Sequence, residues 1–175
     1  MKKIIVAMAA ASAMLGVSAA QAESSHVFFK GQVTDSTCEI NAESKDQTVQ
    51  LPTVIASALA ADGQTAGTRE FTIGMSKCPG NQKLAIRFEP GATVDTKTGW
   101  LKNSLNDGAK NVAIELLNEN ALPIRVTGHQ AEDQYAAKAD ENGNYTQRYF
   151  ARYHATGKAE AGAVESSVAY SVIYQ

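Results

Sequence analysis

The feature of this sequence that most restricts its fold is a repeated pattern in which apolar residues occupy every second position of a short run. Such a pattern places the apolar side chains on one face of a β-strand. Two of these runs lie near the ends of the chain and contain Val27, Phe29, Gly31 and Val33, and Val168, Tyr170, Val172 and Tyr174. Because chain ends are normally frayed, two apolar strands there predict pairing with other strands, within the chain or between chains.

Short alternating runs separated by turn residues fill most of the chain, whereas helical periodicity is weak. Strands are predicted over Val33–Ile40, Thr48–Leu51, Arg69–Cys78, Lys83–Glu89, Asn111–Asn118, Pro123–Val126, Tyr145–Ala155 and Val168–Tyr174. Turn residues lie between them at Pro79-Gly80-Asn81, Pro90-Gly91, Asn106-Asp107-Gly108 and Asn142-Gly143-Asn144. This spacing indicates an all-β fold, an antiparallel sandwich. The Ala-rich segment Val54–Ala61 predicts one short helical turn.

Residues 1–22 have the three parts of a secretory signal peptide. Lys2 and Lys3 give a basic start, an apolar run follows, and Ala20-Gln21-Ala22 forms a small-residue cleavage site. We therefore expect an exported chain that begins at Glu23, with a length that suits one domain and a sizeable core. The formal net charge of the whole chain is −2, and this mild acidity gives no reason to expect a nucleic-acid partner.

The sequence contains two cysteines, Cys38 and Cys78. In an exported protein an isolated pair favours a disulfide, because oxidising compartments let the bond persist. Closing a loop of about 40 residues would stabilise the fold by roughly 4 kcal/mol in the chain-entropy treatment. Two thiols alone are too few for a structural zinc site, which needs four ligands.

No established catalytic motif occurs in the sequence. The segment Gly74–Cys78 lacks the second glycine of a nucleophile elbow, and there is no phosphate-binding glycine loop or metalloprotease helix. The three histidines, His26, His129 and His154, lie in unrelated segments and are interpreted as ordinary surface or sheet-edge residues. Asp140–Asn144 is interpreted as a turn, since the twelfth position of a calcium loop starting there is Ala151. We therefore predict no enzyme activity, no metal and no cofactor.

The two terminal runs carry little of the charge that normally protects a sheet edge. Lys30 is the only charged residue between His26 and Val33, and Val168–Gln175 has none. Both edges are therefore expected to be covered. Gly31 interrupts an otherwise bulky face, which suits a shallow pocket or a close backbone approach; a bulge in an ordinary first strand is the alternative.

Four features in a fixed order make the chain similar to a known family. They are Phe29-Lys30-Gly31-Gln32-Val33 followed by Cys38, the second cysteine Cys78, the stretch Tyr149–Gly157, and the end Tyr170–Gln175. In these features the whole chain after the leader resembles the chaperone-usher fimbrial subunits, or pilins, of the major structural type found in type 1 and F17-like fimbriae.

The resemblance implies an incomplete immunoglobulin-like β-sandwich over residues 34–175 that lacks its final strand, preceded by a donor-strand extension over residues 23–33. The donor residues would be Val27, Phe29, Gly31 and Val33, and they would fill a groove in a neighbouring subunit. The residues Val168, Tyr170, Val172, Tyr174 and Gln175 would line that groove and be read by a periplasmic chaperone. An outer-membrane usher would then join identical or related subunits into a surface fimbria that supports cell adhesion.

Two alternatives are kept beside this hypothesis. The first is a minor or adaptor fimbrial subunit, to which Trp100 and Lys102 could add a secondary surface contact. The second is a self-contained secreted carbohydrate-binding sandwich whose terminal strands pair internally. The aromatic residues Phe71, Phe88, Trp100, Tyr149, Phe150 and Tyr153 are interpreted as core or sheet-face residues, although any one of them could instead stack on a sugar.

Overall fold

The computed structural model describes residues 27–29, 37–80, 83–130 and 136–174. The chain divides into two compact units, Met1–Val33 and Thr34–Gln175. Within the first unit only Val27–Phe29 are described, and they have no regular secondary structure. The predicted signal peptide and the rest of the predicted donor extension lie outside the described residues. We call the second unit the body.

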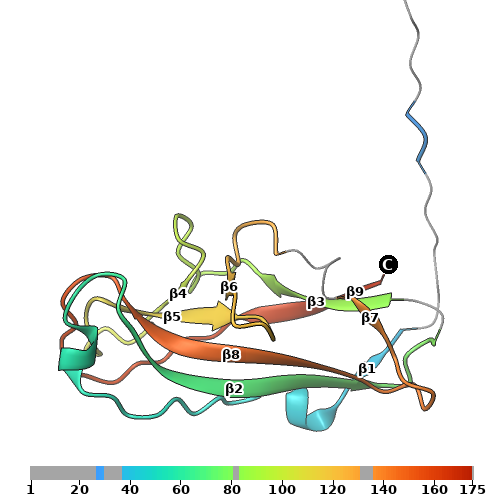
Figure 1. Ribbon diagram of the computed structural model, residues 1–175, viewed down its shortest axis with the longest axis horizontal. Coiled ribbons are helices and arrows are strands. Elements are labelled where there is room, and N and C mark those ends of the chain that lie inside the picture. The colour runs from blue at the N-terminus through green and yellow to red at the C-terminus, as the bar shows by residue number, and fades with distance from the viewer. Residues whose placement is uncertain (1–26, 30–36, 81–82, 131–135, 175) are drawn as a thin grey trace, which may run out of the picture. The chain divides into compact units, whose positions relative to one another are not determined.

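The body is built from two antiparallel sheets (Figure 1). The first sheet has the order β1 (Glu39–Ile40), β2 (Thr65–Ser76), β8 (Tyr145–Ala155), β5 (Val112–Leu117) and β4 (Leu101–Lys102), with β6 (Pro123–Ile124) also paired with β5. The second sheet has the order β7 (Ala137–Lys138), β3 (Lys83–Glu89) and β9 (Ala169–Tyr174). Figure 1 shows β2 and β8 side by side as long strands, with β3 and β9 in the other layer.

The main core lies between these two sheets. Each strand contributes alternate side chains to it, as the period-two pattern requires. Ile73 and Met75 of β2 and Leu84 and Phe88 of β3 are all at most 2% exposed. The ring of Tyr149 on β8 contacts the ring of Phe88 edge to face, with centroids 5.0 Å apart. Contacts between aromatic rings from both sheets therefore hold the layers together.

A second, smaller core lies under the loops at the far end of β8. Its buried residues are Leu59, Ala109, Val112, Ala155 and Ala159. Two short 3-10 helices complete the fold, η1 (Ala42–Ser44) and η2 (Ala56–Leu59), and η2 lies inside the predicted helical turn Val54–Ala61. No helix in the described part of the chain is long and apolar enough to cross a membrane.

Most predicted strands are confirmed. Strands β3 and β8 have the predicted bounds, while β5, β6 and β9 are each slightly shorter. Strand β2 begins at Thr65, before the predicted Arg69, and ends at Ser76, before the predicted Cys78. The pattern missed its first residues because a bulge between Ala66 and Arg69 breaks the alternation there. Gly67 lies in this bulge at φ +66, a left-handed conformation that glycine adopts without a steric penalty.

Two predicted strands at the start of the body need correction. Of Val33–Ile40, the described residues form a ladder only at Glu39–Ile40. The strand predicted over Thr48–Leu51 is absent, and this described segment has no regular secondary structure. Its Gln50 carbonyl accepts a hydrogen bond from the Arg69 side chain at 3.1 Å instead of from a ladder, and Pro52, which follows directly, has no backbone N–H to donate.

Candidate functional site

The last described strand, β9, is paired along one edge only. Its ladder with β3 runs from Glu89 opposite Ala169 to Leu84 opposite Tyr174. Among the described residues its other edge has no ladder partner. An edge of this kind presents N–H and C=O groups to which a further strand can add.

The side chains of β9 are also less completely buried than those of its neighbour β3. The core-facing side chains Leu84, Ile86 and Phe88 of β3 are at most 5% exposed. The corresponding row at β9 packs against the same core but remains half-buried: Val168, Tyr170, Val172 and Tyr174. The two strands also differ in their neighbours: β3 pairs with β9 along its length and with β7 at Lys83 and Leu84, whereas β9 has β3 as its one ladder partner among the described residues.

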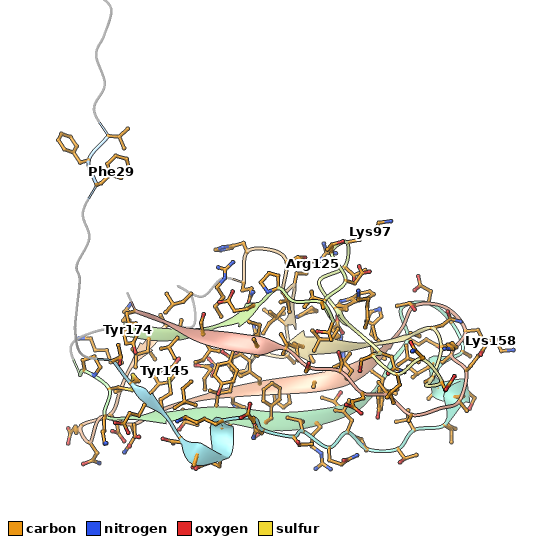
Figure 2. The ribbon with its side chains drawn as sticks, turned by 180° about the vertical axis from the view of Figure 1, so that it is seen from behind. Phe29, Lys97, Arg125, Tyr145, Lys158 and Tyr174 are labelled. Carbon is orange, nitrogen blue, oxygen red and sulfur yellow. A yellow bond between two sulfur atoms is a disulfide. The ribbon has the colours of Figure 1, made fainter. Side chains whose placement is uncertain are left out.

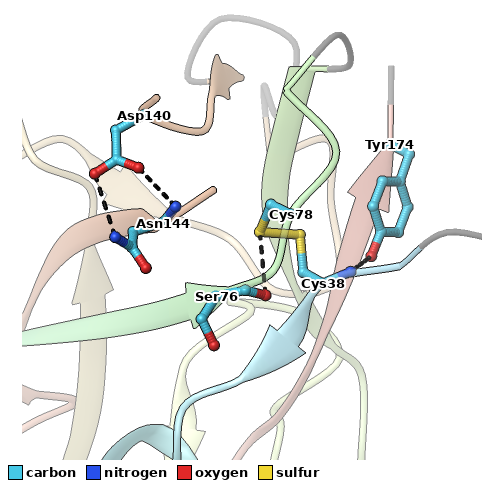
Figure 3. Close-up of a disulfide and its surroundings, with 6 residues drawn as sticks. All are labelled: Cys38, Ser76, Cys78, Asp140, Asn144 and Tyr174. Atoms are coloured by element: carbon cyan, nitrogen blue, oxygen red, sulfur yellow. Dashed lines mark hydrogen bonds between the residues drawn. A yellow bond between two sulfur atoms is a disulfide. The ribbon is translucent and has the colours of Figure 1, made fainter. Parts of the chain in front are cut away.

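The segment 38–51 lies opposite this row. Cys38, Ile40 and Leu51 are half-buried and pack against the main core from that side. The backbone N–H of Cys38 donates to the Tyr174 hydroxyl at 2.8 Å (Figure 3). We call the two facing rows the open seam: Cys38, Ile40 and Leu51 on one side, and Val168, Tyr170, Val172 and Tyr174 on the other.

A second hydroxyl crosses the open seam further along. The Tyr170 hydroxyl donates to the Ser44 carbonyl at 2.7 Å. Burial raises the pKa of Tyr170, and the nearby negative charge of Asp46 raises it further. The hydroxyl therefore keeps its proton in neutral solution and remains a hydrogen-bond donor.

The predicted disulfide between Cys38 and Cys78 is confirmed (Figure 3). Cys78 is 7% exposed, and its backbone N–H donates to the Gly143 carbonyl at 2.9 Å. Figure 2 shows Tyr174 and Tyr145 toward one end of the body and Lys158 toward the other. The disulfide and the hydrogen bond from the Cys38 N–H to the Tyr174 hydroxyl together hold Cys38 at the Tyr174 end of the open seam.

The predicted donor residues are only partly described. Val27 is 77% and Phe29 is 92% exposed, whereas Gly31 and Val33 lie outside the described residues. Gln175, predicted to be part of the C-terminal strand, also lies outside them. The donor assignment therefore stays a prediction.

A second polar cluster, which the sequence analysis did not identify, lies on the outer face of the first sheet. Glu115 of β5 is 3% exposed, and its carboxylate accepts a hydrogen bond from Arg152 Nε on β8 at 2.7 Å. His154 Nδ1 lies 3.4 Å from the same oxygen, and the His154 ring stacks against Trp100 with centroids 3.7 Å apart. We call these four residues the Glu115 cluster.

The interpretation of His154 as an ordinary surface or sheet-edge residue was wrong, because the His154 residue is only 8% exposed. Long-range pairing buries it, because Ala113 of β5 lies opposite it and Trp100 covers its ring. The available signal was the single carboxylate inside the apolar run Val112–Leu117. A buried carboxylate requires a cationic partner, and the arrangement is a structural ion pair.

The predicted turn at Asp140–Asn144 is confirmed. The Asp140 carboxylate accepts hydrogen bonds from the backbone N–H groups of Asn142 and Asn144 at 2.9 and 2.7 Å. These bonds, with that of Asn144 the strongest, lower the pKa of Asp140. Among the described residues, no group of three or more His, Cys, Asp or Glu residues is placed to hold a metal ion.

The known proteins that this chain resembles, in sequence or in fold, are fimbrial or pilus subunits. The chain is 41% identical to the F17 fimbrial protein of Escherichia coli, over 98% of this chain and 97% of that protein. It is 40% identical to a major fimbrial subunit of Stenotrophomonas maltophilia, over 89% of this chain and 95% of that one. The P pilus rod subunit PapA has a similar fold, with a TM-score of 0.64 over 80% of this chain and all of PapA at 18% identity.

These similarities agree with an immunoglobulin-like pilin fold for the body, as expected from the sequence. The family model described as "Fimbrial protein" matches residues 27–175, which include both the terminal run at Val27–Phe29 and the open seam. The chain therefore belongs to the fimbrial protein family.

Proposed function

We propose that this fimbrial subunit builds a filament by strand addition, in which residues 23–33 of one copy complete the second sheet of the next copy along its open seam. The observation that carries the proposal is the half-buried row Val168, Tyr170, Val172 and Tyr174 beside the unpaired edge of β9. A strand added there would bury this row and pair the exposed backbone groups.

Phe29 and Val27 are suited to the role of donor side chains. They are 92% and 77% exposed, and burying an apolar side chain of this size contributes about 1.5–3 kcal/mol. Two such side chains supply roughly 3–6 kcal/mol, a large part of the 5–15 kcal/mol that typically stabilises a whole domain. We therefore expect subunits that separate only under strongly denaturing conditions.

The geometry of such an interface accounts for a filament. The donor segment and the open seam are different surfaces of one chain, so the contact is heterologous and each new subunit leaves one seam available. One relative, from Stenotrophomonas maltophilia, is named as a major fimbrial subunit, which supports a structural and adhesion-supporting role for this chain. Membership of a family of structural proteins likewise favours a non-enzymatic role.

Export is the part of the proposal that depends on residues 1–22. We infer passage through the periplasm, where a chaperone would cover the open seam and the C-terminal strand, followed by assembly at an outer-membrane usher. The finished fimbria would lie on the cell surface. Family membership supports the surface fimbria, and the chaperone and usher follow from the pilin resemblance.

Deletion of residues 23–33 tests the donor assignment. The deletion variant should leave cells without fibres in negative-stain micrographs and should give no heat-resistant ladder of oligomers on gels. Phe29→Ser should weaken assembly, whereas Phe28→Ser is the matched control because alternate residues of a strand face opposite sides. Filaments built by the deletion variant would overturn the proposal.

A further inference from the structure

The turn between β7 and β8 contains an Asn-Gly pair, Asn142-Gly143, which is the only such pair in the sequence. Because glycine has no Cβ, its backbone nitrogen is the least shielded nucleophile that can follow an asparagine. After losing its proton, the Gly143 nitrogen can form a bond to Cγ of Asn142, while the side-chain amide nitrogen takes up a proton and leaves as ammonia. Water then opens the resulting succinimide ring to aspartate or isoaspartate. The pair is therefore chemically able to deamidate with water as its co-reactant.

The backbone of the turn restrains the attacking nitrogen. The Gly143 N–H donates to the Asp140 carbonyl at 3.0 Å, and the Asp140 N–H donates to the Asn144 carbonyl at 2.8 Å. Asn142 itself is exposed, so water reaches it. Attack requires the Gly143 nitrogen to give up its proton and to turn toward the Asn142 side chain, which breaks its hydrogen bond to Asp140. Opening of the turn, and not access of water, therefore limits the reaction.

The Asp140 side chain holds the turn on both sides of Gly143. Its Oδ1 atom accepts hydrogen bonds from the backbone N–H groups of Asn142 at 2.9 Å and Asn144 at 2.7 Å. Figure 3 shows the Asp140 carboxylate directed toward Asn144. Hydrogen bonds to a charged acceptor are roughly twice as strong as those between neutral groups. Loss of this carboxylate should therefore let the turn open more often.

Gly143 also contacts one cysteine of the disulfide. Its carbonyl accepts a hydrogen bond from the Cys78 N–H at 2.9 Å, and a Cβ atom built on Gly143 would lie 3.2 Å from the Cys78 carbonyl oxygen. Isoaspartate adds a methylene group to the main chain between residues 142 and 143, so it lengthens the turn at the place where it packs against Cys78. The hydrogen bond to the Cys78 N–H, beside the disulfide with Cys38, is the contact that this lengthening would break.

We propose that Asn142 is a deamidation site which the Asp140 carboxylate protects by holding the turn closed, and that isoaspartate formed there weakens the contact between the turn and the disulfide. Two contacts of Gly143 carry the proposal: its N–H is bonded within the turn and its carbonyl is bonded to Cys78. The proposal does not depend on strand addition, because all of these residues lie within the body.

Removal of the Asp140 carboxylate tests the proposed protection. Asp140→Ala is compared with the unmodified chain and with Glu141→Ala, the matched control, which removes the same charge from the adjacent residue. Glu141 is exposed and accepts none of the turn hydrogen bonds given above. Each full chain, with its disulfide intact, is incubated at mildly alkaline pH both folded and in urea, and peptide mass spectrometry follows aspartate and isoaspartate at position 142. The unfolded rate divided by the folded rate is the protection factor, in which direct effects of the side chain on the chemistry cancel.

The protection factor should fall in Asp140→Ala. Loss of one hydrogen bond to a charged group makes the opened turn roughly 10-fold more abundant or more, so the protection factor should fall by at least that amount. Glu141→Ala should stay within about twofold of the unmodified chain, as exposed substitutions away from such bonds do. Asp140→Asn keeps a neutral acceptor oxygen and should give a smaller fall, which tests the proposal even if Asp140→Ala fails to fold by circular dichroism.

Two results would overturn the protective role of Asp140. One is a folded, unmodified chain that deamidates as fast as the chain in urea, and the other is an equal protection factor for the unmodified chain and the Asp140 variants. The second half of the proposal is tested on isoaspartate-containing chain separated by ion exchange. Its urea midpoint should lie below that of the unmodified chain, and equal midpoints would show that the contact with Cys78 is not weakened.

Discussion

The Glu115 cluster allows a quantitative test of the fold, because it buries a carboxylate beside one principal cation. The Glu115 side chain is 4% exposed and that of Arg152 is 27% exposed. Removing one partner of a buried pair typically costs 3–5 kcal/mol, because the remaining charge stays uncompensated. Because Arg152 is partly solvated, we expect Arg152→Leu to cost somewhat less than that range, about 2–3 kcal/mol. The double variant Glu115→Leu with Arg152→Leu removes both charges and should cost less than about 1 kcal/mol.

Urea unfolding of the purified subunit measures both variants. Trp100 is the only tryptophan in the chain and stacks on His154, so its fluorescence reports on the Glu115 cluster, while far-ultraviolet circular dichroism reports global unfolding. For an m-value of about 2 kcal/mol/M, Arg152→Leu should lower the midpoint by roughly 1 M or more.

An exposed pair of nearly the same geometry provides the control for this prediction. Lys77 Nζ and Glu39 Oε1 are 2.8 Å apart, with side chains 72% and 61% exposed. Glu39→Gln should cost at most about 1 kcal/mol, because water solvates the remaining ammonium. If Arg152→Leu shifts the midpoint no further than Glu39→Gln, burial of Glu115 does not have the energetic consequence argued above.

Three further changes test other parts of the fold. Replacing Cys38 and Cys78 together by serine should lower the free energy of unfolding by up to about 4 kcal/mol for this loop. The urea midpoint of this variant should equal that of the native chain after its disulfide has been reduced. Burial raises the pKa of Tyr145 to about 12, so the stabilisation present below pH 10 should be lost as the pH rises through about 12, and tyrosinate absorbance should increase together with unfolding. Gln130→Leu should cost about 2–3 kcal/mol in the same assay, because the Gln130 amide bonds both the N–H and the carbonyl of Phe88.

The strands were predictable where alternation and turn residues agree. Strand β8 follows the turn at Asn142-Gly143-Asn144 and alternates without interruption, and its bounds are confirmed. The strand predicted over Thr48–Leu51 was wrong because alternation alone does not provide a partner. Its backbone is engaged by the Arg69 side chain and interrupted by Pro52.

The sequence predicted which residues form one side of the open seam, but it did not predict their hydrogen-bond partners. Tyr170 and Tyr174 follow from the period-two pattern, but their hydroxyl partners Ser44 and Cys38 lie 126 and 136 residues away in sequence. Gln130, in a loop, offers no local signal that its amide completes the edge of β3. Such contacts depend on how distant segments are brought together, which a pattern along the chain does not encode.

The tyrosines of the open seam show how one edge can be held together and still accept a strand. The rings of Tyr170 and Tyr174 pack against the main core, while their hydroxyls satisfy the Ser44 carbonyl and the Cys38 N–H on the opposite side. Core-facing side chains point away from the line of the edge hydrogen bonds, so these contacts leave the backbone N–H and C=O groups of β9 unused. Aliphatic residues in the same positions would bury similar surface but leave the opposite side without partners. The open seam is thereby stabilised by side chains, and the backbone edge of β9 stays available for the strand addition proposed above.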